Sequence, residues 1–280
     1  MFKRLKGKLL ILPAKLFLIL WCGFSLFALL WILISSFKTN KEFFANVWGF
    51  FESPQISNYI KVLTKYNLGT YFGNSFIVVG ISVALILAVS TPAAYVLSRF
   101  RFRSQNFLSK FFLLGLGVPL QMLLIPLYFT LLSMGLVNSL VGLVLVYVAI
   151  SIPFTVYLLS GFFAALPHEL EESAAIDGCS PMRAFFKIML PLGGPAIVSA
   201  AIFNSIELMH ELMLVKALIT DDAKKTLSVG LYGLQGSLQY TGDWVSLFAG
   251  FVVSIFPLVI LYMFLSRRII EGITMGAVKG

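Results

Sequence analysis

Long apolar stretches, separated by short polar segments that carry most of the charge, set the pattern of this chain. A helix needs about 20 mostly apolar residues to cross a bilayer. Six stretches are long enough, with boundaries at Leu16–Phe37, Tyr71–Ser98, Phe107–Ser133, Val137–Phe163, Leu192–Leu218 and Trp244–Leu265. The pattern therefore predicts an all-α membrane protein with six transmembrane helices.

Lys and Arg residues indicate the side of the membrane on which each polar segment lies. With the N-terminus in the cytosol, the outer segments hold Lys38, Lys41, Lys61, Lys65, Lys216, Lys224 and Lys225. The other fourteen of the 21 Lys and Arg residues fall in inner segments, which is the excess typical of cytosolic loops. We expect both termini in the cytosol, with residues 1–15 as an N-terminal segment, 16–266 as the membrane domain and 267–280 as a tail.

Composition supports the membrane assignment and excludes other classes. The chain is 59% hydrophobic and 12% charged, with a mean hydropathy of +0.94, whereas about a quarter of a soluble domain is charged. The net charge of +9 does not indicate a nucleic-acid partner, because the cations lie between apolar stretches and suit membrane lipid. The first stretch is longer than a signal-peptide core, so we expect an uncleaved helix. Cys22 and Cys179 are expected to be reduced.

Two further features leave alternatives open. Prolines inside the predicted spans favour kinks, or hinges of a moving gate, and they are Pro92, Pro119, Pro126, Pro153 and Pro257. The segment Ile219–Asp243 is expected to be a glycine-containing outer loop. A loop of this length is either a tolerated surface loop or a contact for an external partner.

The polar segment between the fourth and fifth spans, Ala165–Pro191, predicts a short helix, a turn and a second helix. Three glutamates crowd the first turn of the first helix, where the helix dipole favours carboxylates. Asp177–Gly178 should end that helix, and Ser180 with Pro181 should begin the next. The segment would expose acidic and small residues together. Such a surface suits either a docking partner or a solvated interfacial loop.

The same segment resembles the EAA loop of ABC importer permeases. The family pattern is E-A-A, three residues, G, nine residues and then I-x-L-P. The matching residues are Glu172, Ser173, Ala174, Gly178, Ile188, Leu190 and Pro191. Ser173 replaces the usual alanine, and it is also small, so close packing should be kept.

The C-terminal tail Arg267–Gly280 resembles the ending of the maltose-type carbohydrate permeases. The residues that carry this match are Gly272, Thr274, Gly276, Ala277, Val278, Lys279 and Gly280. The resemblance implies a type I ABC importer permease fold in a bacterial plasma membrane. It also implies a sugar or oligosaccharide as cargo, moved by alternating access.

The resemblance further implies partners and site residues. A cytosolic ATPase dimer would hold ATP and Mg, and no cofactor is expected on this chain, which has no phosphate-loop motif. The coupling residues would be Glu169, Glu171, Glu172, Ser173, Ala174, Asp177, Gly178, Ile188, Leu190 and Pro191, and the tail Gly276–Gly280 would lie at the ATPase interface. A second permease chain would complete a heterodimer, and an extracellular solute-binding protein would deliver the sugar.

Polar residues within the spans are candidates for the pore. Asn204, Glu207 and Glu211 fall on one face of the fifth span. Ionisable residues in a span usually face a cavity or another helix. Asn74, Gln121 and Tyr128 are further candidates. For the residues of the fifth span, lining of a gate or substrate site remains open beside hydrogen bonding between helices or a position near the outer interface. Asn74, Gln121 and Tyr128 could line the pore or pack against the partner chain.

Other functions compete with this interpretation. The same machinery could carry a polyamine, a glycerol phosphate or an amino acid, and a channel or secondary transporter would work without an ATPase. An enzyme is not indicated, because the sequence shows no nucleophile–base–acid set and no metal-ligand cluster, and His168 and His210 are isolated.

Overall fold

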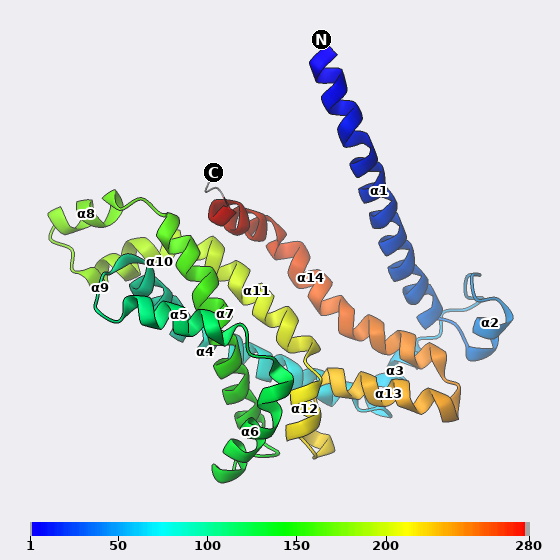
Figure 1. The fold of residues 1–280 in the computed structure, drawn as a ribbon. Helices are drawn as coiled ribbons and strands as arrows, with labels where there is room; N and C mark the ends of the chain where they lie inside the picture. The colour runs from blue at the N-terminus through cyan, green and yellow to red at the C-terminus, as the bar shows by residue number, and fades with distance from the viewer. Residues whose placement is uncertain (1, 278–280) are drawn as a thin grey trace. The chain divides into compact units, whose positions relative to one another are not determined.

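The chain is mainly helical in the part that the computed structural model describes, namely the backbone of residues 2–277 and the side chains of residues 13–257, 259, 260 and 263. No strand occurs in residues 2–277. The long helices are α1 Phe2–Ser36, α4 Leu68–Arg99, α7 Leu140–Ala165 and α14 Trp244–Ala277. The shorter elements are α2 Asn40–Ala45, α3 Ser57–Thr64, α5 Gln105–Gly115, α6 Leu120–Ser133, α8 Glu169–Ile176, α9 Pro181–Ala184, the π-helix η1 Phe185–Met189, α10 Leu190–Leu192, α11 Gly194–His210, α12 Met213–Leu218, the 3-10 turn η2 Asp222–Lys224 and α13 Leu227–Thr241 (Figure 1). The all-α class is confirmed.

Three helices among the described residues are long and apolar enough to cross a membrane: Pro13–Ser36 within α1, and the whole of α4 and α7. Two bent helix pairs raise this number to five if each pair counts as one span. The apolar part of α14 that the structure describes, Trp244–Pro257, is shorter. The count of six spans therefore stays a prediction.

The predicted third span, Phe107–Ser133, is wrong as a single helix. The structure breaks it into α5 and α6, whose axes differ by 101°. Gly115 ends α5, and Pro119 is the N-cap of α6 in an extended conformation. Proline has no backbone N–H and disfavours a helical residue before it. Pro119 therefore lies at a break in the chain instead of a kink.

The predicted fifth span, Leu192–Leu218, is also interrupted. Helix α11 ends at His210, and α12 begins at Met213. Glu211 between them is extended, with φ −62° and ψ 126°. A continuous apolar pattern therefore hides an interruption of the helix at this glutamate.

The expected loop Ile219–Asp243 is wrong for most of its length, because α13 occupies Leu227–Thr241. Its glycines suggested a loop, but Gly230 instead allows close packing. A Cβ atom at Gly230 would lie 2.3 Å from the ring of Tyr71 on α4. Only glycine fits at that contact.

The chain divides into two compact units, each with its own core. The first comprises Met1–Gly69 and Leu231–Phe256, and the second comprises Thr70–Gly230 and Pro257–Gly280. The core of the second unit joins α4, α7, η1 and α11. Its fully buried members include Leu159, Phe163 and Met189. This core positions the segment that follows α7.

Asp243 is the polar centre of the first unit. Its carboxylate accepts hydrogen bonds from Ser246 at 2.7 Å, Asn40 at 3.0 Å and Tyr66 at 3.2 Å, and it forms an ion pair with Lys61. Burial favours a higher pKa for this carboxyl, but the bonds from Lys61, Ser246 and Asn40 outweigh burial and hold the pKa of Asp243 at about 2. The carboxylate therefore ties α2, α3 and the start of α14 together.

Candidate functional site

The segment after α7 folds into the helix, turn and helix that the sequence predicts. Helix α8 begins at Glu169, and its end is a Schellman turn: the N–H of Gly178 bonds the carbonyl of Ala175 at 3.0 Å, and the N–H of Cys179 bonds that of Ala174 at 2.8 Å. Gly178 has φ +75°, a conformation that costs glycine little. Helix α9 then begins with Ser180 as N-cap and Pro181 in its first turn.

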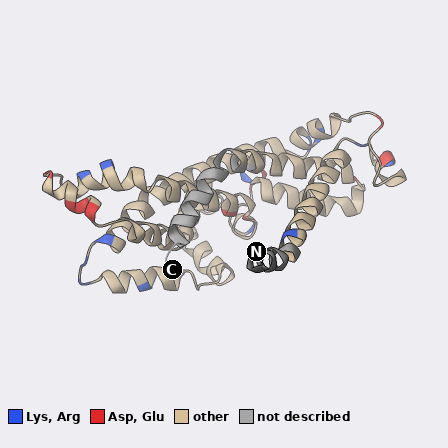
Figure 2. Ribbon diagram, turned by 90° about the horizontal axis from the view of Figure 1, so that it is seen from above, with Lys and Arg blue, Asp and Glu red and all other residues tan. Residues whose placement is uncertain are grey.

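Helix α8 has two distinct faces. Glu169, Glu172, Ser173 and Ile176 are exposed and fall on one side of the helix, with Ile176 87% exposed. Ala174 on the other side is buried. Figure 2 shows acidic residues gathered at this helix. The outer face is therefore acidic, with one large apolar side chain, and it is open to a partner.

Glu171 belongs to the inner face and contacts α4. One carboxylate oxygen accepts a hydrogen bond from the hydroxyl of Tyr95 at 2.6 Å. The other accepts from Nε of Arg99 at 2.5 Å and forms an ion pair with the same guanidinium. The adjacent acids Glu171 and Glu172 therefore point in different directions.

Arg99, the last residue of α4, also bonds the end of α7. Its Nη1 donates to the carbonyl of Leu166 at 2.8 Å and to that of Phe163 at 3.4 Å, and its Nη2 donates to Pro167 at 3.0 Å. The last carbonyls of a helix have no partner within the helix. A basic side chain at that position satisfies them and suits the helix dipole. The side chain of Arg99 is only 1% exposed.

The second half of the loop is packed against the core. Ile188 and Leu190 are half-buried and pack against the cluster around Phe163, whereas Pro191 is exposed. Two residues after Pro191, a Cβ atom added at Gly193 would lie 3.0 Å from the ring of Phe163. The I-x-L-P end of the motif thus leads into α11 through a glycine at which a side chain would crowd Phe163.

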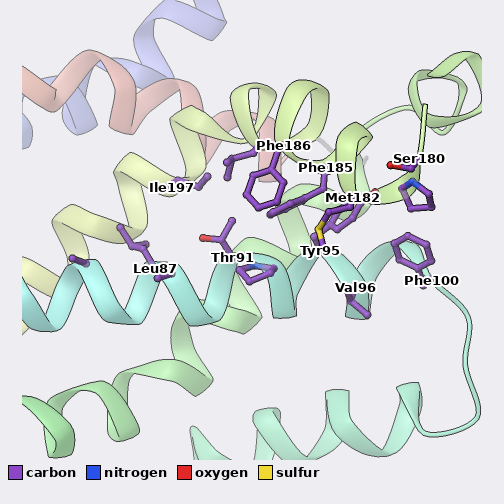
Figure 3. A pocket seen from close by; sticks show the side chains of 15 residues that line it. Leu87, Thr91, Tyr95, Val96, Phe100, Ser180, Met182, Phe185, Phe186 and Ile197 are labelled. Atoms are coloured by element: carbon purple, nitrogen blue, oxygen red, sulfur yellow. The ribbon is translucent and has the colours of Figure 1, made fainter. Parts of the chain in front are cut away.

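An apolar groove of about 910 Å³ lies between α4 and the segment from α9 to α11. Figure 3 shows Thr91 and Tyr95 of α4 on one wall and Phe185 and Phe186 on the other. The rings of Tyr95 and Phe185 lie 4.9 Å apart. Tyr95 therefore lies where the groove meets the buried core.

The two asparagines among the candidate pore residues make internal hydrogen bonds. Asn204 is 1% exposed, and its amide donates to Thr155 at 2.9 Å and to the carbonyl of Ala200 at 2.8 Å. Asn74 donates to the carbonyls of Ala223 and Lys225. Of the alternatives left open for Asn204, its bond to Thr155 favours a contact between helices, whereas Asn74 bonds a neighbouring segment of the same chain.

The other candidates lie elsewhere. Glu207 is exposed and lines a cavity of about 490 Å³ beside the break between α5 and α6. Gln121 is exposed and Tyr128 is half-buried on α6. Glu211 caps α12: its carboxylate accepts from the N–H groups of Leu214 at 2.8 Å and Val215 at 3.2 Å. The six candidates do not form one cluster.

The tail is described only in part. Gly276 and Ala277 end α14, and Val278, Lys279 and Gly280 lie outside the described residues. The sequence also did not single out Arg99 or Tyr95, the residues that hold Glu171. Arg99 is the first of three arginines that follow the second span, and only its position at the helix end distinguishes it from Arg101 and Arg103.

This helical membrane fold, with its acidic helix fastened to two long helices, is that of a permease component of an ATP-binding-cassette importer. The chain belongs to the family of the binding-protein-dependent transport system inner membrane component, whose sequence model matches residues 77–274. The membership in ABC importer permeases that the EAA-like loop indicated is thereby confirmed.

Relatives match the chain over almost its whole length. It is 37% identical over 262 residues to the diacetylchitobiose uptake system permease protein NgcG of Streptomyces coelicolor, covering 94% of this chain and 87% of that protein. It is 33% identical over 279 residues to the trehalose/maltose transport system permease protein MalG of Thermococcus litoralis, covering 99% and 98%. These matches support the carbohydrate branch of the family.

A solved structure shares the fold. A chain in the crystal structure of a bacterial ABC transporter involved in the import of the acidic polysaccharide alginate matches with a TM-score of 0.79 at 20% identity. The match covers 93% of this chain and 96% of that chain.

Proposed function

We propose that this chain carries a sugar or oligosaccharide across the plasma membrane, with energy from ATP hydrolysed on a separate subunit. The names of the relatives support the cargo, since these proteins are described as permeases for diacetylchitobiose and for trehalose and maltose. The chain itself then acts as a transport subunit and not as an enzyme.

The outward face of α8 is the observation that carries this proposal. Glu169, Glu172 and Ile176 are exposed on a helix whose other side is held by Arg99 and Tyr95. A fixed acidic face suits a basic groove of a partner, because charge complementarity guides association and sets orientation. We assign this face to the cytosolic ATPase, with Glu172 paired to a basic residue there.

The remaining partners follow from the same assignment. A second permease chain forms a heterodimer with this one, an extracellular solute-binding protein delivers the sugar, and the tail 276–280 lies along the ATPase. Both termini are cytosolic. ATP and Mg are bound by the ATPase dimer, and this chain holds no cofactor.

Glu207 is the strongest of the proposed contacts to cargo. It lines the cavity beside the α5–α6 break together with Ser151 and Phe154. Non-helical backbone at membrane depth is tolerated where it is enclosed by protein or faces a water-filled cavity. Carboxylate and hydroxyl groups bind sugar hydroxyls, and an aromatic ring packs against a sugar face. Gln121 and Tyr128 on α6 are assigned to the same path.

Purification and uptake test the proposal together. We expect an ATP-hydrolysing subunit to co-purify with the tagged chain in mild detergent, and a strain lacking the chain to lose uptake of labelled oligosaccharides. Glu172→Arg should reduce the recovery of the ATPase, whereas Glu52→Arg, which changes an exposed acid in the first unit, should not. If no ATPase accompanies the chain and the deletion strain transports normally, the proposal is wrong.

A further inference from the structure

We infer that Arg99, together with Tyr95, is the positioning residue that transmits the movement of α8 to the membrane helices α4 and α7. This inference rests on the proposed function, because α8 moves only if an ATPase engages its outer face. It assigns to the cytosolic end of α4 a role in energy coupling.

A single guanidinium joins three elements. Arg99 belongs to α4, bonds the last carbonyls of α7 through Nη1, and bonds Glu171 in the first turn of α8 through Nε. Its Nη2 also donates to Pro167 in the connection between α7 and α8. Each of its three nitrogens therefore holds a partner. No displacement of α8 relative to α4 leaves all of these bonds intact.

Glu171 is held at both oxygens. Tyr95 bonds Oε1 and Arg99 bonds Oε2. Residues 95 and 99 are four positions apart and therefore lie on one face of α4. Because the hydroxyl of Tyr95 and Nε of Arg99 each bond a different oxygen, they fix the direction of the Glu171 carboxylate as well as its position. A pull on α8 is thus transmitted to α4 along the helix axis.

The environment of this link makes it stiff. The side chain of Arg99 is almost fully buried, and Tyr95 is 4% exposed, with its ring against Phe163 and Phe185. Hydrogen bonds to charged groups are strong in a dry environment, and an uncompensated buried charge is unfavourable. The groove beside Tyr95 leaves part of the face between α4 and the α9–α11 segment unpacked. The polar link therefore adds a connection from α4 to α8 beside the packing of Tyr95 against Phe163 and Phe185.

Two neighbouring arginines serve as matched controls. Arg101 and Arg103 are exposed and make no hydrogen bond or ion pair with other described residues. They share the charge of Arg99 and its place after the second span. If positive charge alone mattered after the second span, all three arginines would contribute to transport. If the bonds to α7 and α8 matter, only Arg99 contributes.

The test compares variants of the purified complex with its ATPase and binding protein in proteoliposomes. Arg99→Lys keeps the charge but loses the planar set of donors, and Tyr95→Phe removes one hydroxyl from an otherwise unchanged site. The readouts are the amount of ATPase bound and the number of sugar molecules transported per ATP hydrolysed. We expect Arg99→Lys to keep the ATPase and lower the transport ratio about tenfold, within the range of typical coupling free energies. Tyr95→Phe should lower it less, and Arg101→Lys should match the wild type.

Two outcomes would overturn the inference. In one, Arg99→Lys and Tyr95→Phe transport as many molecules per ATP as the wild type. In the other, they lose the ATPase itself, which would make the residues part of the docking surface and not of the transmission. A wild-type chain that binds no ATPase is a different result, and it overturns the proposed function as well.

Discussion

The hydroxyl of Tyr147 donates a hydrogen bond of 3.2 Å to the carboxylate of Glu211, and this bond ties α7 to the break between α11 and α12. The same carboxylate accepts from the backbone N–H groups of Leu214 and Val215. The first N–H groups of a helix have no partner within it. Glu211 thus supplies acceptors for the start of α12, and Tyr147 fixes its orientation.

Glu211→Ala should therefore destabilise the chain. Loss of a capping side chain reduces the free energy of unfolding by about 1–2 kcal/mol. Glu211→Gln keeps one carbonyl acceptor and should lower the free energy of unfolding by less than Glu211→Ala does. Tyr147→Phe should lower it least, because the carboxylate of Glu211 still accepts from the N–H groups of α12. Thermal unfolding in detergent gives this order. Equal melting temperatures for Glu211→Ala and the wild type would show that the cap contributes nothing.

Asn204→Leu should leave stability almost unchanged. The amide oxygen of Asn204 is buried and has no hydrogen-bond partner among the described residues. Thr155 keeps its bond to the carbonyl of Ser151 in the variant. Hydrogen bonds between membrane helices contribute only about 0.6 kcal/mol on average, so an apolar side chain of similar size should compensate. Asn204→Ala, which leaves a cavity, should melt at a lower temperature. A large loss of stability in Asn204→Leu alone would contradict this interpretation.

Gly178→Val should abolish uptake while the protein stays in the membrane. A Cβ atom at this position would meet no other atom within 4 Å, so the substitution causes no clash. A β-branched residue at φ +75° is nevertheless strained, because its backbone strongly disfavours that conformation. Gly178→Asn is the control, since asparagine adopts this conformation more readily. Uptake assays and immunoblots of membranes separate transport from expression. If Gly178→Val transports normally, the turn is not needed for coupling.

The Asp243 cluster should give the first unit a distinct pH dependence. A carboxyl with a pKa of about 2, below the value of about 3.9 in an unfolded chain, adds stability that is complete above the unfolded pKa. The contribution is lost as pH falls toward 2. The melting temperatures of wild type and Asp243→Asn should therefore differ by a constant amount above about pH 5 and converge below about pH 4. A difference that persists at about pH 2 would rule out the ion pair as its cause.

The sequence predicted α8 and its turn well because local chemistry determines them. Gly178 supplies the positive φ that ends α8, and Ser180 with Pro181 begins α9. Each of these residues lies within a few positions of the helix end that it determines. The bond between Arg99 and Glu171 joins residues 72 positions apart. No local pattern distinguishes that glutamate from its neighbour, so both were assigned to docking.

The breaks in the spans escaped prediction for another reason. Hydropathy records that residues 107–133 and 192–218 are apolar but not that their helices change direction. Glu211 looked like a pore residue, because a lone carboxylate in an apolar stretch gives no sign that it caps a backbone. Helix α13 was missed because Gly230 serves a tight contact with Tyr71, which is distant in sequence.

Helix α8 has only eight residues, and helices of fewer than about 12 residues are marginal in water. Its shape therefore depends on the bonds from Tyr95 and Arg99, which belong to a different stretch of the chain. A synthetic peptide covering residues 165–191 would lack both donors and would be largely unfolded. If α8 docks on the ATPase as proposed, such a peptide would compete poorly for that site, and an inhibitor directed there would need its own rigid scaffold.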